Sequence, residues 1–123
     1  GVTFEKICTD YLYSRNAKGE LPFLFTTIGR WWGTNPQTHE QVEIDIIANE
    51  QKDYLIGECK WRNEKLDIGV LASLREKADI FCKKREHTWF ILFSKSGFTE
   101  KLKLREQEEE NVRLISFEDM NQL

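Results

Sequence analysis

The sequence lacks several features that would place it in a familiar class. No apolar run approaches the roughly 20 residues of a membrane-spanning helix, and no signal-peptide pattern is present. The three cysteines are an odd number without CxxC spacing and the two histidines are solitary, which argues against a disulfide framework or a zinc site. We therefore expect a protein of the reducing cytoplasm with no membrane partner.

The chain does contain enough apolar sequence for one compact domain. Of its 123 residues, 40% are hydrophobic and 32% are charged, which is typical of a folded domain and not of a disordered segment. We therefore expect a single domain over residues 1–123. The chain begins GVTFEKI, without an initiator Met and almost directly in a helical pattern, so we interpret it as a piece of a longer protein.

Hydrophobic periodicity predicts both helices and strands. Apolar residues at helical spacing predict a first helix over residues 2–15, and Asp67 can cap a second helix whose apolar face runs from Leu71 to Cys82. The expected strands cover residues 23–33, 41–48, 53–61, 87–94 and 112–116. Further helices are expected at 98–110 and 117–123. The order α-β-β-β-α-β-α-β indicates an α/β domain that begins with an antiparallel meander.

Two of the expected strands carry charged residues where burial would be costly. Asp45 lies within 41–48, and Glu58 and Lys60 lie within 53–61. A charge moved away from water is expensive unless it is paired or bound to a metal. Strict alternation along 41–48 places Ile44 and Ile46 on one face and Asp45 on the other.

The pairing of these two strands decides whether the charges meet. If Asp45 lies opposite Glu58 in an antiparallel pair, Glu43 lies opposite Lys60 and all four charged groups share one face, while Cys59 faces away. Glu5 borders the apolar stripe of the first helix, so a helix resting on the sheet would aim it along the sheet surface. The sequence thus predicts a group of acids with one lysine.

Such a group of carboxylates needs a counterion. At about 5 Å and an effective dielectric constant near 20, each pair of carboxylates costs about 3 kcal/mol. Hard oxygen ligands without histidine favour Mg²⁺ or Mn²⁺ over zinc. A neighbouring lysine can orient an attacking water or stabilise charge that develops on phosphorus, which is the chemistry of phosphodiester hydrolysis. The alternative is a solvated sheet face with Asp45–Lys60 or Glu58–Arg62 ion pairs.

These residues resemble the motif of a nuclease superfamily. Asp45, twelve intervening residues and then Glu58-Cys59-Lys60 are similar to the PD-(D/E)xK motif, although Ile44 stands where the motif has proline. Glu5 matches the extra acid of its resolvase-like branches. The tail FSKSGFTEKLKLREQEEENVRLISFEDM resembles the end of Mrr-type restriction endonuclease domains, and IGRWWG, EIDII and GECKW are similar to segments in the C-terminal domain of archaeal-type AAA ATPases.

The resemblance covers essentially the whole chain and implies a restriction endonuclease-like αβββαβ core, with a central mixed sheet flanked by helices. It implies a Mg²⁺- or Mn²⁺-dependent DNA endonuclease domain at the C-terminal end of a longer ATPase. Asp45 and Glu58 would bind the metal, Lys60 would support the attacking water and the transition state, and Glu5 would assist. The expected partners are DNA and the ATPase domain of the same chain, and a homodimer is left open. The alternative function is a catalytically silent module that docks DNA or protein for the ATPase.

Basic residues give candidates for contact with the DNA backbone. The segment from Lys60 to Arg85 holds eight basic and four acidic residues, although the whole chain has a net charge of −3. An ordinary solvated helix face is the alternative explanation of this segment. If the segment binds DNA, the affinity should fall steeply with salt concentration. The candidate residues are Arg30, Arg62, Lys77, Lys83 and Lys84.

Overall fold

The computed structural model describes residues 3–121, and its elements follow the expected order. The elements are α1 (Phe4–Ala17), β1 (Gly29–Thr34), β2 (Gln41–Glu50), β3 (Asp53–Lys60), α2 (Ile68–Phe81), β4 (His87–Ser94), α3 (Glu100–Glu108), β5 (Val112–Ser116) and α4 (Phe117–Met120). Short polar side chains cap the helices: Asp67 accepts a hydrogen bond from the Ile68 amide at 2.8 Å, and Thr99 accepts one from the Leu102 amide at 3.3 Å. None of the helices within residues 3–121 is long and apolar enough to cross a membrane.

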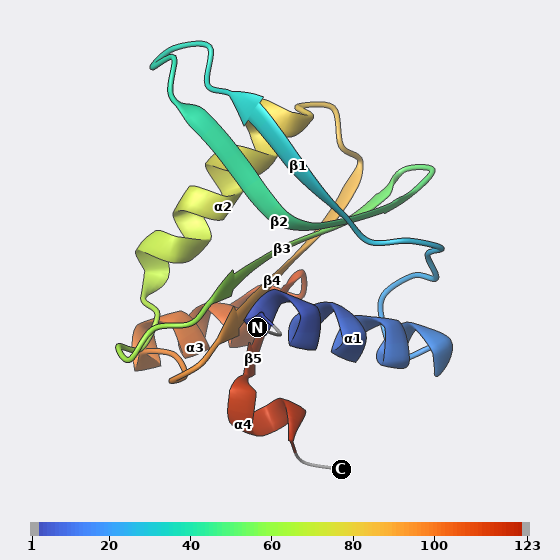
Figure 1. Ribbon diagram of the computed structural model, residues 1–123, viewed down its shortest axis with the longest axis vertical. Helices are drawn as coiled ribbons and strands as arrows, with labels where there is room; N and C mark the ends of the chain where they lie inside the picture. Colours follow the sequence, from blue (N-terminus) through green and yellow to red (C-terminus); the bar gives the residue numbers. More distant parts are fainter. Residues whose placement is uncertain (1–2, 122–123) are drawn as a thin grey trace.

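The five strands form one mixed sheet in the order β1-β2-β3-β4-β5 (Figure 1). The first three strands pair antiparallel, whereas β4 and β5 run parallel to β3. Parallel neighbours need a crossover connection, and the segments that contain α2 and α3 provide one each. The protein is therefore an α/β domain whose mixed sheet is flanked by helices, as the sequence predicts.

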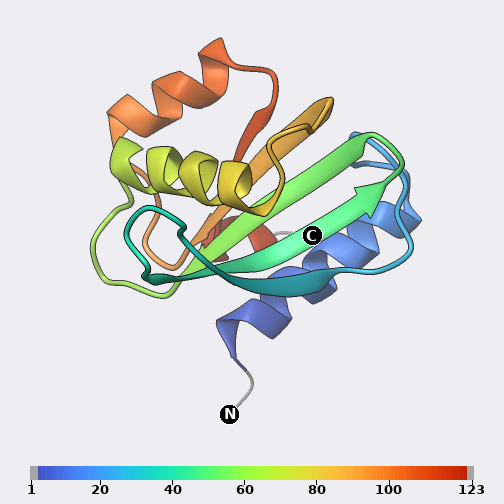
Figure 2. The same ribbon diagram turned by 90° about the horizontal axis from the view of Figure 1, so that it is seen from above.

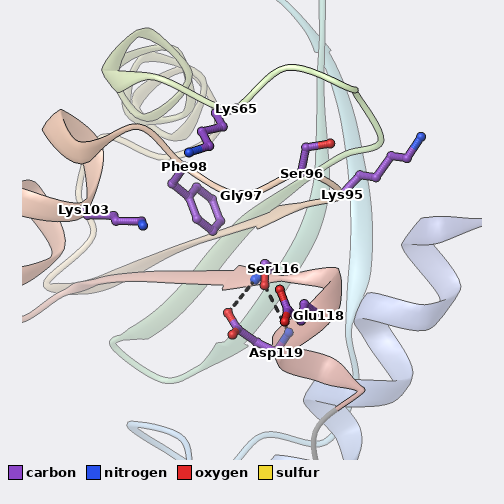
Figure 3. A pocket seen from close by; sticks show the side chains of 9 residues that line it. All are labelled: Lys65, Lys95, Ser96, Gly97, Phe98, Lys103, Ser116, Glu118 and Asp119. Carbon is purple, nitrogen blue, oxygen red and sulfur yellow. Dashed lines mark hydrogen bonds between the residues drawn. The ribbon is translucent and has the colours of Figure 1, made fainter.

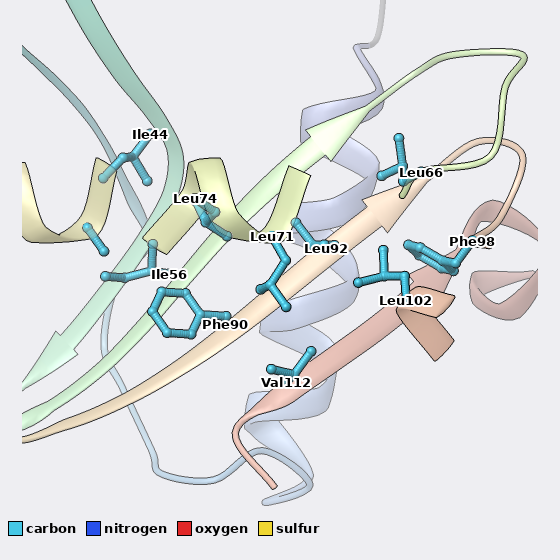
Figure 4. Close-up of a cluster of buried hydrophobic side chains, with 11 residues drawn as sticks. Ile44, Ile56, Leu66, Leu71, Leu74, Phe90, Leu92, Phe98, Leu102 and Val112 are labelled. Carbon is cyan, nitrogen blue, oxygen red and sulfur yellow. The ribbon is translucent and has the colours of Figure 1, made fainter. Parts of the chain in front are cut away.

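Helices cover both faces of the sheet, α1 on one and α2 and α3 on the other (Figure 2). Each face has its own hydrophobic cluster. The cluster under α2 and α3 is drawn in Figure 4 and includes Ile44, Ile56 and Leu74, which are fully buried. The cluster under α1 includes Ile46 and Phe93, which are also fully buried. Burial on both faces explains why β4 is apolar along most of its length.

The segment before β1 is not a strand, which corrects the prediction of a strand over 23–33. Phe25 is buried against α1, and its backbone pairs with a side chain: the Asn16 amide donates to the Phe25 carbonyl at 2.8 Å and accepts from the Phe25 amide at 3.1 Å. Aromatic residues here fill the cluster under α1 without joining the sheet. Strand preference was overridden by tertiary packing.

An extra residue in β2 corrects the prediction of strict alternation. Gly29 pairs with Ile47 and Trp31 pairs with Ile44, so two steps along β1 span three steps along β2. As a result Ile44 packs under α2 and Ile46 packs under α1, instead of sharing a face. Such a bulge re-aims the side chains beside it. Beyond it, the start of β2 diverges from the end of β3 (Figure 1).

Candidate active site

Three carboxylates meet on the α1 side of the fork between β2 and β3. Glu5 from α1 and Glu43 and Asp45 from β2 each place an oxygen within 4.8 Å of the others. Glu5 lies in the first turn of α1, which Thr3 caps, and the bulge in β2 turns Asp45 toward this helix. We call these three residues the acidic group. The predicted placement of Glu5 along the sheet surface is confirmed.

One arginine partly compensates the acidic group. Arg30 of β1 lies 3.3 Å from a Glu5 oxygen and also donates a hydrogen bond to Glu43. Asp45 takes part in none of the ion pairs formed within residues 3–121; its Oδ2 accepts a hydrogen bond from the Cys59 amide at 2.9 Å. Three carboxylates against one guanidinium leave two excess negative charges when all are ionised. Arg30 was predicted to contact DNA. A DNA phosphate would have to compete with these two carboxylates for the Arg30 guanidinium.

This environment raises the pKa of Glu5 above its ordinary value of 4.5. Burial is the largest cause, the negative charge of Asp45 is the second, and the opposing charge of Arg30 does not cancel them. Both effects disfavour the ionised form of the carboxyl. The acidic group is therefore an unfavourable arrangement when only Arg30 neutralises it.

We expect Glu5→Gln to stabilise the protein at neutral pH in the presence of EDTA. Because its pKa is raised, folded Glu5 holds its proton more tightly than unfolded Glu5 does. The free energy of unfolding therefore falls as the pH rises from 4.5 through the folded-state pKa. The glutamine variant should have a higher Tm than wild type at pH 7, and the difference should vanish toward pH 4.

Thermal unfolding followed by circular dichroism across this pH range measures the effect. Glu86→Gln is the control, because Glu86 is exposed and pairs with Lys52 outside the acidic group. A glutamine variant less stable than wild type at pH 7 would show that the Arg30–Glu5 ion pair outweighs the repulsion.

Glu58 lies on the other side of the sheet from the acidic group. It is only 3% exposed, its Oε1 accepts a hydrogen bond from Lys77 Nζ of α2 at 2.6 Å, and its Oε2 lies 3.7 Å from Lys60 Nζ. The prediction that Glu43, Asp45, Glu58 and Lys60 share one face is therefore wrong, because the bulge turns the two acids of β2 toward α1. We call Glu58, Lys60 and Lys77 the lysine-paired group.

The two groups meet where β2 leaves β3. The backbone pairing of these strands ends at Ile46–Gly57, one residue before the predicted pair of Asp45 with Glu58. Beyond Gly57, β3 no longer pairs with β2. The Cys59 amide instead donates a hydrogen bond to the Asp45 carboxylate. Asp45 therefore bonds the residue that follows Glu58, and a single peptide connects the two groups.

Cys59 faces away from Glu58 and Lys60, as predicted, but the acids of β2 have moved to its side of the sheet. Cys59 therefore packs under α1 on the side of the acidic group, whereas the sequence predicted that it faces away from Glu43 and Asp45. A hydrogen bond with Cys8, followed by burial, raises its pKa far above the ordinary value for a thiol. Cys59 therefore stays protonated, and the ionised ligands available beside Asp45 are oxygen atoms.

The remaining predicted residues divide into exposed and enclosed ones. Arg62, Lys83 and Lys84 are exposed, so they are accessible for phosphate contact. Lys77 was predicted to contact DNA but turns inward to Glu58. Lys77 comes three residues after Leu74 and so borders the apolar face of α2. This spacing was the sequence feature that could have predicted its inward orientation. Within the described residues, neither the Asp45–Lys60 nor the Glu58–Arg62 ion pair of the alternative interpretation occurs.

Comparison with known proteins places the chain in a family. Residues 1–79, more than half of the chain, match DUF234, which is described as archaea bacterial proteins of unknown function. The chain belongs to the DUF234 family. A curated relative, the uncharacterized protein MJECL04 of Methanocaldococcus jannaschii, is 40% identical over 67 residues, which are 53% of this chain and 14% of the relative. This DUF234 chain therefore corresponds to a small part of that protein's length.

Two solved structures share the fold of this DUF234 domain. One is the protein of unknown function AF1548, with a TM-score of 0.55 and 16% identity over 90% of this chain and 58% of that one. The other is a repair endonuclease from Pyrococcus abyssi, with a TM-score of 0.53 and 15% identity over 95% of this chain and 48% of that one. Identities this low show the fold alone. The fold of an endonuclease fits the expected restriction endonuclease-like core.

Proposed function

We propose that this DUF234 domain is a divalent-metal-dependent nuclease that hydrolyses phosphodiester bonds in DNA, with an active site of the PD-(D/E)xK type. The observation that carries the proposal is the acidic group, whose three carboxylates converge beside the strand that bears Glu58 and Lys60. The likeness in fold to a repair endonuclease supports the same reaction class. The association with an AAA-type ATPase, expected from the sequence, remains part of the proposal.

The residues present fit a hard divalent cation. The acidic group offers oxygen ligands only, carries excess negative charge and contains a carboxyl whose pKa is raised by burial and repulsion. Asp45 with Glu5 would hold Mg²⁺ or Mn²⁺. Glu58 was also predicted to bind the metal, but it lies on the other side of the sheet and is held by Lys77, so this arrangement gives it no place beside that ion. When bound, such an ion polarises a phosphoryl oxygen and lowers the pKa of a bound water.

Lys60 is the proposed cationic partner of the reacting phosphate. It lies at the end of β3 and contacts Glu58 at 3.7 Å, longer than the 2.6 Å contact of Lys77. Lys77 alone can therefore hold the buried carboxylate while Lys60 moves toward a phosphate. A positive charge aimed at the phosphoryl oxygens stabilises the charge that develops in the transition state.

A second candidate function is a silent docking module for the same ATPase. The observation that favours it is the lysine-paired group. Two lysines already neutralise the charge of Glu58, so this carboxylate needs no metal ion. A buried ion pair of this kind can have a purely structural role. The exposed Lys83 and Lys84 would serve DNA contact in either case.

Titration with Mn²⁺ under calorimetry separates the two functions. Wild type should bind the metal, and Asp45→Asn should weaken binding by at least about tenfold, since even groups that merely support a metal ligand are worth about 10–100-fold. The asparagine keeps an oxygen for the Cys59 amide, so the fold is retained. Asp10→Asn, an exposed acid of α1 paired with Lys6, should leave the affinity unchanged. Wild type that binds no Mn²⁺ would refute the metal site.

A further inference from the structure

Trp61 directly follows Lys60, yet the proposed reaction gives it no role. It is 52% exposed, although its ring is fixed by two neighbours: the Phe4 ring centroid lies at 4.9 Å and the Phe117 ring centroid at 5.3 Å in an edge-to-face arrangement. Contacts with α1 and α4 therefore hold a large aromatic surface in place while half of it remains open to solvent. A rigid exposed aromatic ring is suited to stacking on a flat ligand.

A hollow of about 360 Å³ opens beside this ring. It is lined by Thr3, Phe4, Ile7, Trp61 and Phe117, so its walls are apolar and largely aromatic. Its volume lies within the range of small-ligand pockets in proteins, roughly 300–1,000 Å³. We call it the Trp61 pocket.

Lysine side chains lie on one side of the Trp61 pocket. Lys95 Nζ lies 4.9 Å from the centre of the Trp61 ring and donates to Asn63 Oδ1 at 2.8 Å. Lys95 also borders a second hollow of about 440 Å³, into which Lys65 and Lys103 extend (Figure 3). Glu118 and Asp119 form its opposite wall, and Asp119 is engaged with Ser116 in the cap of α4. The lysines offer this side of the pocket to an anionic chain.

The position of the pocket relates it to the proposed active site. The Lys95 amide donates to the Lys60 carbonyl at 3.1 Å, so the pocket lies at the carboxyl ends of the parallel strands β3 and β4. Ligands of α/β sheets commonly bind at this edge. Phe4 precedes Glu5 in the first turn of α1, so one turn of helix contributes both to the pocket and to the acidic group.

We propose that the Trp61 pocket receives an unstacked nucleobase of the nucleic-acid substrate, with Lys95 and Lys65 contacting the phosphates that flank it. This inference rests on the proposed nuclease function. A base stacked inside a duplex cannot enter the pocket, so the substrate class is a single strand or a duplex with a frayed or branched end. Aromatic side chains that accept bases beside a basic surface are the usual architecture of single-strand binding.

Binding measured without cleavage tests the pocket. Fluorescence anisotropy in EDTA would compare a labelled single strand with a duplex of the same length. Trp61→Ala should weaken single-strand binding by about 5- to 100-fold and duplex binding much less. Trp61→Phe should retain most of the affinity. Leu24→Ala is the control, because Leu24 is 69% exposed but lies before β1 and outside the pocket, and it should bind as wild type does.

The charge of Lys95 gives a second readout that leaves the aromatic packing in place. Lys95→Gln should weaken single-strand binding and lower the slope of log affinity against log salt by about 1. If Trp61→Ala does not fold, as judged by circular dichroism, Lys95→Gln decides the matter. The subsite is overturned if folded Trp61→Ala or Lys95→Gln binds the single strand as wild type does, or if single strand and duplex lose affinity equally, as for a pocket that docks a protein segment.

Failure of the nuclease proposal remains distinguishable from failure of the subsite. Wild-type cleavage combined with unchanged single-strand binding by Trp61→Ala rejects the subsite alone. Absence of any metal-dependent cleavage, combined with a selective loss of single-strand binding, supports the subsite and rejects the enzyme.

Discussion

Replacing Lys60 with alanine is expected to lower the rate of metal-dependent DNA cleavage by about 10²–10³, the usual effect of removing one group aimed at a transition state. The fold should survive, because Lys77 still pairs with Glu58 at 2.6 Å. Mn²⁺ affinity should also be retained, since the acidic group is untouched. Single-turnover cleavage of supercoiled, linear and branched DNA at high enzyme concentration, in Mg²⁺ and in Mn²⁺, measures the loss.

Lys52→Ala is the matched control for Lys60→Ala. Lys52 is an exposed lysine of the turn between β2 and β3 and pairs with Glu86, so its loss removes the same charge without touching the fork. Asp45→Asn should lose both cleavage and metal binding. Cleavage that persists unchanged in both Lys60→Ala and Asp45→Asn would come from another site or from a contaminant. Folded wild type without cleavage on any of these substrates would instead support the silent docking module.

The architecture was accessible from the sequence because it depends on local patterns. The apolar run 87–94 coincides with β4, and Asp67 caps α2 as expected. The register of β2 and β3 was also predictable, because the order of turn and apolar residues constrains a two-stranded antiparallel pair. These elements required no knowledge of distant contacts.

The arrangement of the site was less accessible because it depends on pairing with a third strand. The bulge in β2 arises opposite β1, between the partners of Gly29 and Trp31, and no glycine or proline in β2 marks it. One extra residue was enough to place Asp45 and Glu58 on opposite faces. The contact between Lys77 and Glu58 depends in addition on how α2 crosses the sheet, which helical periodicity alone does not determine.

Gly57 couples the fold to the site, and Gly57→Val is expected to damage both. A Cβ at this position would lie 2.6 Å from Ile91 Cγ2 of β4, 3.2 Å from the Ile91 carbonyl oxygen and 3.3 Å from Ile46 Cβ of β2. Neither neighbouring strand can yield without disturbing a buried cluster. Overpacking of this kind costs at least about 1–3 kcal/mol of the free energy of unfolding, which urea denaturation would measure.

The same substitution should lower cleavage more than instability alone explains. To relieve the clash, β3 must move relative to β2 and β4, and Glu58 and Lys60 move with it; a misplacement of about 1 Å can cost about 10²-fold in rate. Gly69→Ala is the control, because no atom lies within 4 Å of its Cβ position in α2, and alanine in a helix should stabilise by about 0.4–1 kcal/mol. If folded Gly57→Val cleaves DNA as fast as wild type, the end of β3 does not position the reacting groups, and the catalytic role of Lys60 fails with it.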